Sequence, residues 1–203
     1  MIDRTIRSRE LMAFDYSYKK SGVILAGMDE AGRGPLAGNV VAACVVMPDT
    51  PVIPWIDDSK KLSEKRRNAV FEQIMEHALY IGVGEASPEE IDQINILEAT
   101  KRAMFSAASS VPADVFLIDA VKNLGLKGTE VPLIKGDALS YSIAAASIIA
   151  KVVRDRQMCE MDKLYPEYGF IRNKGYGTKE HVDALKRIGP CPIHRRSFIG
   201  HFV

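Results

Sequence analysis

Cysteine is scarce in this sequence of 203 residues, and the three that occur, Cys44, Cys159 and Cys191, lie far apart. An odd number of widely spaced cysteines provides neither a disulfide framework nor a C-x-x-C metal knuckle. Such cysteine usage is typical of a reducing compartment, so we expect a cytoplasmic location.

Long apolar runs are also absent. No stretch reaches the roughly 20 residues of a membrane span, and charges interrupt the N-terminal sequence MIDRTIRSRELMAFDYSYKK, which excludes the apolar core of a secretory signal. With 47% hydrophobic and 26% charged residues, the composition is that of one globular domain with a full core. We expect a protein that is neither exported nor anchored in a membrane.

The net charge is only +1 at pH 7, but it is unevenly distributed. From Gly169 onward, seven basic residues stand against two acidic ones, so the preceding chain carries a net negative charge. A basic end joined to an acidic body is suited to docking phosphates while keeping carboxylates for another role. A solvated basic face without a nucleic-acid partner explains the charge equally well.

Apolar runs and helical patterns succeed one another along the chain, which predicts an α/β fold. Strands are expected at 23–28, 39–47, 79–84, 115–118 and 131–134. The last of them contains Pro132 and is expected at the edge of the sheet. Helices are expected at about 64–78, 88–109, 138–164 and 179–188.

The composition changes beyond Pro166, where glycine, proline, aromatic and basic residues surround the last short helix. The pattern therefore divides the chain into an N-terminal extension at 1–22, a main domain at 23–165 and a C-terminal appendage at 166–203.

Four acidic residues stand where predicted strands end or where a buried helix begins: Asp29, Glu30, Asp119 and Asp137. One end of one sheet could gather all four. Carboxylates that close repel one another and stay fully ionised only when cations bind them, and oxygen ligands suit Mg²⁺ or Mn²⁺. Two such ions about 3.5 to 4 Å apart can promote phosphodiester hydrolysis. No cysteine or paired-histidine spacing supports zinc.

Neighbouring residues on a regular strand point to opposite faces, so Asp29 and Glu30 cannot both face inward unless the strand breaks. Gly32 and Gly34 follow closely and permit a break, because glycine tolerates strained backbone conformations. We expect Glu30 to turn at the end of the strand and to reach a second metal ion.

Six sequence blocks together resemble the ribonuclease HII family, in that family's order. They are GMDEAGRGPLAG at 27–38, DSKKLS at 58–63, FLIDA at 116–120, KGDALSYSIAAASIIAKVVRD at 135–155, GYGTKEH at 175–181 and HRRSF at 194–198. The resemblance covers nearly the whole chain after Gly22. It implies a ribonuclease H-like fold, with a five-stranded mixed sheet flanked by helices and a small helical appendage that binds substrate.

The resemblance also implies roles for single residues. Asp29, Glu30 and Asp119 are expected to be catalytic metal ligands, and Asp137 is expected to be a ligand, to hold a water or to bind only the second ion. The loop Gly32-Arg33-Gly34 is expected to read the ribose 2′-hydroxyl through backbone groups.

Further substrate contacts are expected at Ser59 and Lys60 and at Arg195 and Arg196, all to phosphates. Taken alone, Ser59 and Lys60 are explained equally well as a helix cap and a solvated side chain. Tyr176 matches a tyrosine that stacks on a substrate sugar. His181, His194 and Ser147 also fall in matching blocks; structural roles are the commoner outcome for such histidines, and we expect Ser147 to be a packing residue.

The resemblance implies a metal-dependent endonuclease that cuts RNA–DNA hybrids and single ribonucleotides in duplex DNA, leaving 3′-hydroxyl and 5′-phosphate ends. Its expected roles are the removal of misincorporated ribonucleotides and of primer remnants. We expect a monomer; a replication clamp is a possible partner that no residue supports. One alternative is a silent nucleic-acid-binding module. Another is the type 3 enzyme, which is expected to carry an additional N-terminal domain.

Overall fold

The computed structural model describes residues 4–203, so residues 1–3 of the predicted extension lie outside the described residues. Its centre is a five-stranded sheet with the order β3-β2-β1-β4-β5. The strands are β1 (Leu25–Ala31), β2 (Val40–Val46), β3 (Tyr80–Ala86), β4 (Val115–Asp119) and β5 (Thr129–Leu133). Strands β1, β2 and β3 are antiparallel, whereas β1, β4 and β5 are parallel. The predicted mixed sheet is confirmed, and β5 lies at its edge.

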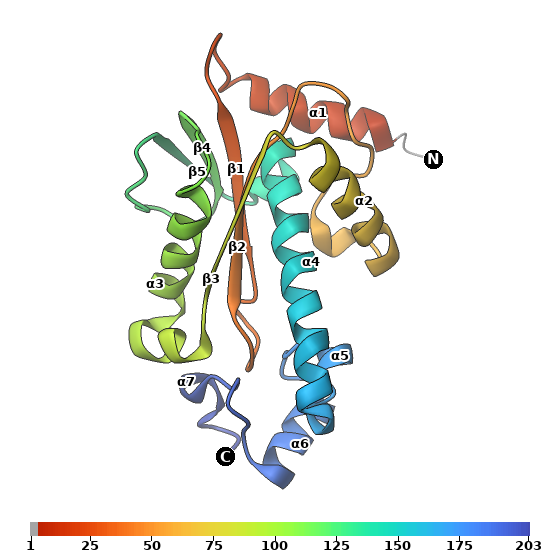
Figure 1. Ribbon diagram of the computed structural model, residues 1–203, viewed down its shortest axis with the longest axis vertical. Helices are drawn as coiled ribbons and strands as arrows, with labels where there is room; N and C mark the ends of the chain where they lie inside the picture. Colours follow the sequence, from red (N-terminus) through yellow and green to blue (C-terminus); the bar gives the residue numbers. More distant parts are fainter. Residues whose placement is uncertain (1–3) are drawn as a thin grey trace.

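Helices cover both faces of the sheet (Figure 1). The long helices are α1 (Arg4–Tyr16), α2 (Glu64–His77), α3 (Pro88–Ala108), α4 (Tyr141–Leu164) and α6 (Lys179–Ile188); the short ones are α5 (Phe170–Asn173) and α7 (Arg196–Ile199). Helix α3 packs on one face, and α4 packs on the other with α1 and α2 outside it. Helices α5 to α7 gather beyond one end of the sheet (Figure 1).

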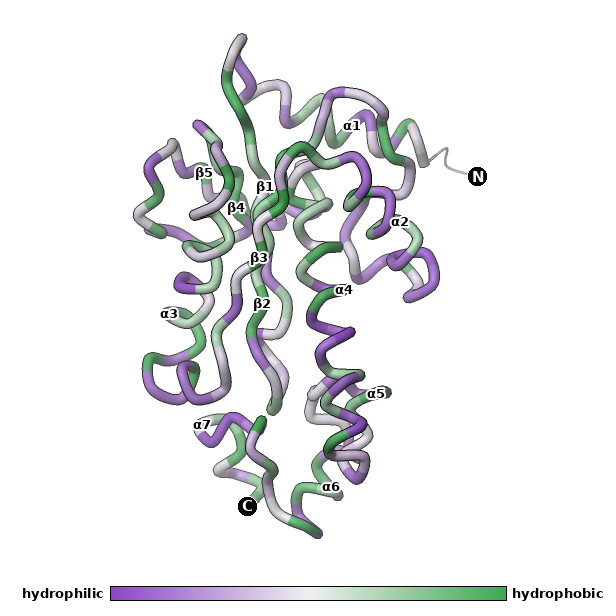
Figure 2. Tube along the Cα trace, viewed as in Figure 1, coloured by the Kyte–Doolittle hydropathy of each residue, from purple (hydrophilic) through white to green (hydrophobic). Residues whose placement is uncertain are grey.

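Two apolar layers therefore enclose the sheet. The hydropathy colouring shows the apolar residues of β1 and β2 and of the first turns of α4 (Figure 2). The first six residues after Tyr141 in α4 are all buried, which confirms that this helix lies against the sheet. None of the helices at 4–203 is long and apolar enough to cross a membrane.

Helix α1 was not predicted, because charged residues interrupt its apolar positions. Leu11 and Met12 nevertheless join the core beside α2 and α4. The Asp15 carboxylate accepts a hydrogen bond of 2.8 Å from the backbone nitrogen of Ser142, at the start of α4. The described part of the N-terminal extension thus packs against the main domain.

The contact between β1 and α4 is unusually close at Gly27. A Cβ atom added there would lie 2.0 Å from the backbone carbonyl carbon of Ser142. Only a residue without a side chain allows the two backbones to approach in this way. Gly27 therefore fixes how near the buried helix lies to the strand that carries Asp29 and Glu30.

Gly27→Ala should destabilise the protein by about 1–3 kcal/mol or more, because neither backbone can move aside without disturbing the core. Urea unfolding measures this change. Gly200→Ala is the matched control, since a Cβ at Gly200 meets no atom within 4 Å and its φ of −59° suits alanine. Equal stabilities of the two variants would contradict the close-approach argument.

Two buried histidines of residues 166–203, the predicted C-terminal appendage, contact each other. His181 Nε2 lies 2.9 Å from His194 Nε2, while His181 Nδ1 lies 2.8 Å from the carbonyl oxygen of Tyr176. The backbone nitrogen of Cys191 donates to His194 Nδ1. One neutral tautomer of each ring satisfies all of these hydrogen bonds. His194 donates from Nε2 to Nε2 of His181, and His181 donates from Nδ1 to the carbonyl oxygen of Tyr176. The geometry thus gives both histidines a structural place behind Tyr176.

Protonation of His181 would set two donors against each other at the Nε2–Nε2 contact, and protonation of His194 would set its Nδ1 against the backbone N–H of Cys191. Burial lowers the pKa of His194 to about 4, with a further contribution from His181, and burial also lowers the pKa of His181 below its ordinary value of 6.5. The unfolded chain therefore binds more protons than the folded protein between about pH 6.5 and 4.

The free energy of unfolding should consequently fall as the pH is lowered through this window. Urea unfolding at several pH values, for the natural sequence and for His194→Asn, measures the contribution of the pair. The variant should be less stable at pH 7 but should lose less stability on acidification. Parallel pH profiles would show that the two rings are not held neutral.

Candidate active site

Three of the four predicted acids come together at the ends of β1 and β4. One carboxylate oxygen from each of Asp29, Asp119 and Asp137 lies within 4.8 Å of the other two. Asp119 is the last residue of β4, and its Oδ1 accepts a 2.7 Å hydrogen bond from the backbone nitrogen of Gly136. Asp137 lies in the short helix η2 (Gly136–Ala138), between β5 and α4. The expectation that one sheet end gathers these acids is therefore realised for the three aspartates.

Glu30 is placed differently from the expectation. Strand β1 does not break after Asp29: its pairing with β2 continues through Glu30 and Ala31. Asp29 faces α4, where Ser147 hydrogen-bonds to it, and the Glu30 carboxylate lies near enough to Asp29 and Asp119 to interact with their charges. The predicted turn at Glu30 is thus wrong, and Glu30 lies outside the group of three mutually close oxygens.

The acids repel one another and lie in a poorly solvated place. Burial raises the pKa of Asp29 well above its usual range, and the charges of Glu30 and Asp119 raise it further. Burial also raises the pKa of Glu30, although Arg33 opposes the shift, and it raises that of Asp137 together with the charges of Asp58 and Asp119. A cation would relieve both causes at once.

The donor set fits a hard divalent cation. Only carboxylate oxygens converge, and Oε2 of Glu30 is buried with no hydrogen bond from any described residue. Such an orphaned oxygen is costly unless it has a partner. Mg²⁺ and Mn²⁺ prefer oxygen ligands of this kind, so Asp29, Asp119 and Asp137, with Glu30 beside them, suit either ion.

A cleft of about 200 Å³ opens beside these acids. Its lining joins segments far apart in the chain: Asp29, Glu30, Ala31, Gly32, Arg33, Gly34, Ser59, Lys60, Ser147, Lys151 and Tyr176. A Cβ at Gly34 would lie 3.9 Å from the Tyr176 ring, so the glycine loop and the tyrosine are neighbours. Tyr176 as a whole residue is 43% exposed. Six of the predicted substrate-binding residues therefore share one cleft.

Ser59 and Lys60 open the short helix η1 (Ser59–Lys61), whose cap is Asp58 rather than Ser59. The buried Ser59 hydroxyl lies 2.8 Å from that of Ser147 on α4. The Lys60 side chain is 80% exposed, and its Nζ lies 3.9 Å from Asp137 Oδ2. Burial lowers the pKa of Lys60, but Asp137 and other nearby carboxylates outweigh this effect and raise it. Lys60 thus holds a positive charge over the acids.

Arg195 corrects a prediction. It is 0% exposed, and its guanidinium donates only to backbone carbonyls, so it is not available to bind a phosphate. Arg196 is exposed, but neither arginine lines the cleft. Sequence reasoning could not separate these adjacent residues, because both are basic and lie in one matching block.

Two residues of α4 line the cleft although the sequence analysis did not assign them to it. Ser147 was expected only to pack, and Lys151 was not singled out, yet both line the cleft. The Lys151 Nζ lies 2.7 Å from Asp155 Oδ1 and 5.8 Å from the centre of the Tyr176 ring. Their spacing was a usable signal, because residues 147, 151 and 155 share one face of a helix.

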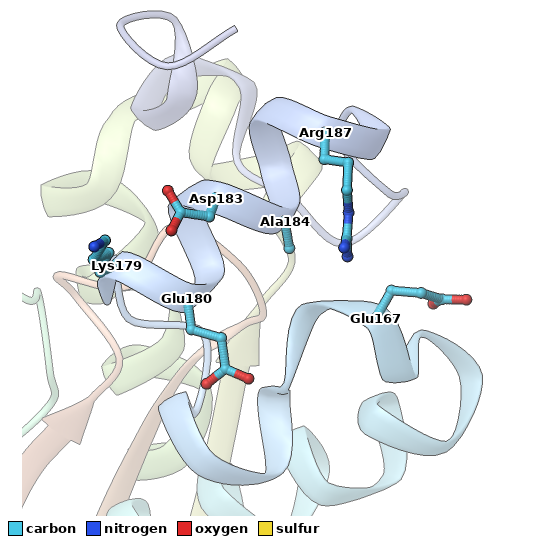
Figure 3. Close-up of a pocket in the computed structure, with 6 residues that line it drawn as sticks. All are labelled: Glu167, Lys179, Glu180, Asp183, Ala184 and Arg187. Atoms are coloured by element: carbon cyan, nitrogen blue, oxygen red, sulfur yellow. The ribbon is translucent and has the colours of Figure 1, made fainter.

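A larger hollow, of about 540 Å³, lies on the C-terminal appendage between α6 and the turn at Glu167 (Figure 3). Charges of both signs surround Ala184 there, and Glu180 pairs with Arg172. It shares no residue with the acidic cleft. Its mixed charges give it no preference for an anion or a cation.

Comparisons with known proteins agree with this geometry. The family model described as Ribonuclease HII matches residues 26–201. The ribonuclease HII of Ruminiclostridium cellulolyticum is 52% identical over 97% of this chain and 78% of its own length. The ribonuclease H2 of Pyrococcus horikoshii superposes with a TM-score of 0.72 and 28% identity, over 85% of this chain and 92% of that one.

A second solved structure is that of ribonuclease HII from Archaeoglobus fulgidus in complex with PCNA. It superposes with a TM-score of 0.74 and 26% identity, over 86% of this chain and 94% of that one. The fold, the acidic cleft and the match along almost the whole sequence all agree, and the chain belongs to the ribonuclease HII family.

Proposed function

We propose that this protein hydrolyses the RNA strand of RNA–DNA hybrids and cuts duplex DNA on the 5′ side of single embedded ribonucleotides. The observation that carries the proposal is the convergence of Asp29, Asp119 and Asp137 beside a cleft lined by the glycine loop and Tyr176. Membership of the family supports ribonuclease activity. The geometry supports a reaction at a phosphodiester that is placed beside these acids.

Asp29, Asp119, Asp137 and Glu30 would hold Mg²⁺ or Mn²⁺. Such an ion supplies a Lewis acid that lowers the pKa of water and offsets charge on a phosphodiester. Hydrolysis adds a water oxygen to phosphorus and releases the 3′ oxygen of the preceding nucleotide with a proton. The products are a 3′-hydroxyl end and a 5′-phosphate end.

The residues around the acids would bind and orient the substrate. Lys60, exposed beside Asp137, provides a point charge for a phosphate. Gly32, Arg33 and Gly34 would approach the ribose 2′-hydroxyl through their backbone, and Tyr176 would stack on the sugar that follows it. Arg196 would contribute phosphate affinity from outside the cleft, within a substrate-binding appendage at 166–203 that is joined to the catalytic domain at 23–165.

The biological role would be the removal of misincorporated ribonucleotides and primer remnants in the cytoplasm, by a monomer. The complex of the Archaeoglobus relative with PCNA supports a replication clamp as a possible partner. A duplex with one ribonucleotide, incubated with Mg²⁺ or Mn²⁺ and analysed for its product ends, tests the activity. Binding without cleavage would contradict the proposal and favour a silent binding module.

Asp29→Asn should lower cleavage by more than the roughly 10–100-fold that loss of an outer partner costs, because it removes a ligand charge. Without metal, the variant should be at least as stable as the natural protein, since one repulsive charge is gone. Turnover at saturating metal and urea unfolding measure the two effects. Asp183→Asn, an exposed substitution on α6, is the control. Normal turnover of Asp29→Asn would disprove the metal site.

Tyr176→Ala should slow cleavage at a single embedded ribonucleotide about fivefold to tenfold, because stacking on a sugar is expected at the low end of the roughly 1–3 kcal/mol for aromatic stacking on bases. Cleavage of a continuous RNA strand should fall less, and Tyr176→Phe should retain most activity on both substrates. Equal losses on the two substrates would reduce Tyr176 to general positioning or packing.

A further inference from the structure

Arg195 is a buried cation without an acidic partner. It forms no ion pair with any of residues 4–203, although its side chain is fully enclosed. Burial, with the nearby charge of Arg154, lowers its pKa to about 9, although the charge of Asp92 opposes this shift. An unpaired buried charge is costly, so the surrounding dipoles must compensate it.

Those dipoles are backbone carbonyls of residues 32–39, the segment that begins with the glycine loop. The Arg195 guanidinium makes five hydrogen bonds, of 2.6 to 3.0 Å, and all go to backbone oxygens of Gly32, Arg33, Pro35 and Gly38. Arg154, which is also buried, donates to the carbonyls of Ala37, Asn39 and Lys174. Six of the eight carbonyls at 32–39 are therefore bound by one of two guanidiniums. Residues 32–39 therefore surround the guanidinium groups of Arg154 and Arg195.

The hydrogen bonds from Arg195 set the direction of the amide groups of Arg33 and Gly34. In a trans peptide the N–H points away from the C=O of the same unit. The carbonyls of Gly32 and Arg33 are turned to Arg195, so the N–H groups of Arg33 and Gly34 point the other way. Neither N–H donates to an acceptor among the described residues. Both residues line the cleft, and the cleft is thus provided with two free donors in a fixed geometry.

We infer that Arg195, supported by Arg154, is a positioning residue for ribose recognition. It holds the loop so that the amides of Arg33 and Gly34 face the 2′-hydroxyl oxygen. This inference rests on the proposed function, because it assigns the discrimination between ribose and deoxyribose to the proposed substrate cleft. Arg195 itself contacts no substrate.

The loop sequence and the choice of arginine both fit this role. Gly32 has a φ of +98°, and a Cβ there would lie 2.1 Å from Arg154 Nε, so only glycine permits the guanidinium to pass. Arg195 uses Nε, Nη1 and Nη2 together. A lysine ammonium concentrates three donors at one point and cannot reach four separate carbonyls. Charge alone therefore does not replace Arg195.

The test compares the affinities of Arg195→Lys for two duplexes of one sequence, with and without a single ribonucleotide, in EDTA so that no cleavage occurs. The natural protein should prefer the ribonucleotide. Arg195→Lys should lose at least about fivefold of this preference, as expected when a hydrogen bond to the 2′-hydroxyl is lost, while its affinity for the all-DNA duplex should change less than about twofold. Arg187→Lys, exposed on α6, is the matched control.

Circular dichroism and thermal melting establish that each variant is folded. If Arg195→Lys does not fold, Arg154→Lys carries the same test, because it loosens the other half of the same loop. An unchanged preference in a folded variant, or a parallel fall in both affinities, would overturn the inference. A natural protein that bound the two duplexes equally and cut neither would instead contradict the proposed function, which separates the two failures.

Discussion

The close approach of α4 to β1 at Gly27 is the constraint on which the site depends. Because no side chain separates the strand from Ser142, the helix lies directly beside the strand. Ser147 and Lys151, about one and a half and two and a half turns further along, then reach the cleft next to Asp29. A wider separation would leave Asp29 without its hydroxyl partner and the cleft without one wall.

The site combines groups whose individual placement is unfavourable. Three aspartates converge at the end of the sheet, and the guanidiniums of Arg154 and Arg195 are buried and donate to backbone carbonyls. Neither of these two arginines forms an ion pair with the acids of the cleft. Carbonyl dipoles surround the arginines, which leaves the carboxylates available for an external cation. The two buried guanidiniums therefore do not neutralise the aspartates, although they lie in the same small region.

Much of this arrangement could be predicted from local signals. The strands, the capped helix after Ser87 and the buried helix after Ser140 follow from periodicity and capping. Asp119 could be placed because it ends an apolar run. Helix α1 could not, since its stability comes from packing of Leu11 and Met12 rather than from propensity.

Other features depended on tertiary context. The unbroken strand at Glu30 depended on how far β2 pairs with β1, which no residue near Glu30 indicates. Arg195 is buried and Arg196 is exposed because Arg195 binds a loop that lies more than 150 residues away in sequence. Local patterns identify which residues are unusual. Only the packed structure shows whether a basic side chain faces solvent or the protein's own backbone.

The wrapping of residues 32–39 around Arg195 has a consequence for the order in which the protein matures. The loop emerges early during synthesis, but its partner follows 157 to 163 residues later. Closing so long a connection is entropically costly and belongs to late stages of folding. A nascent chain with its strands already paired would lack an ordered recognition loop. The protein would therefore become able to distinguish ribose from deoxyribose only after the sheet and the three aspartates are in place.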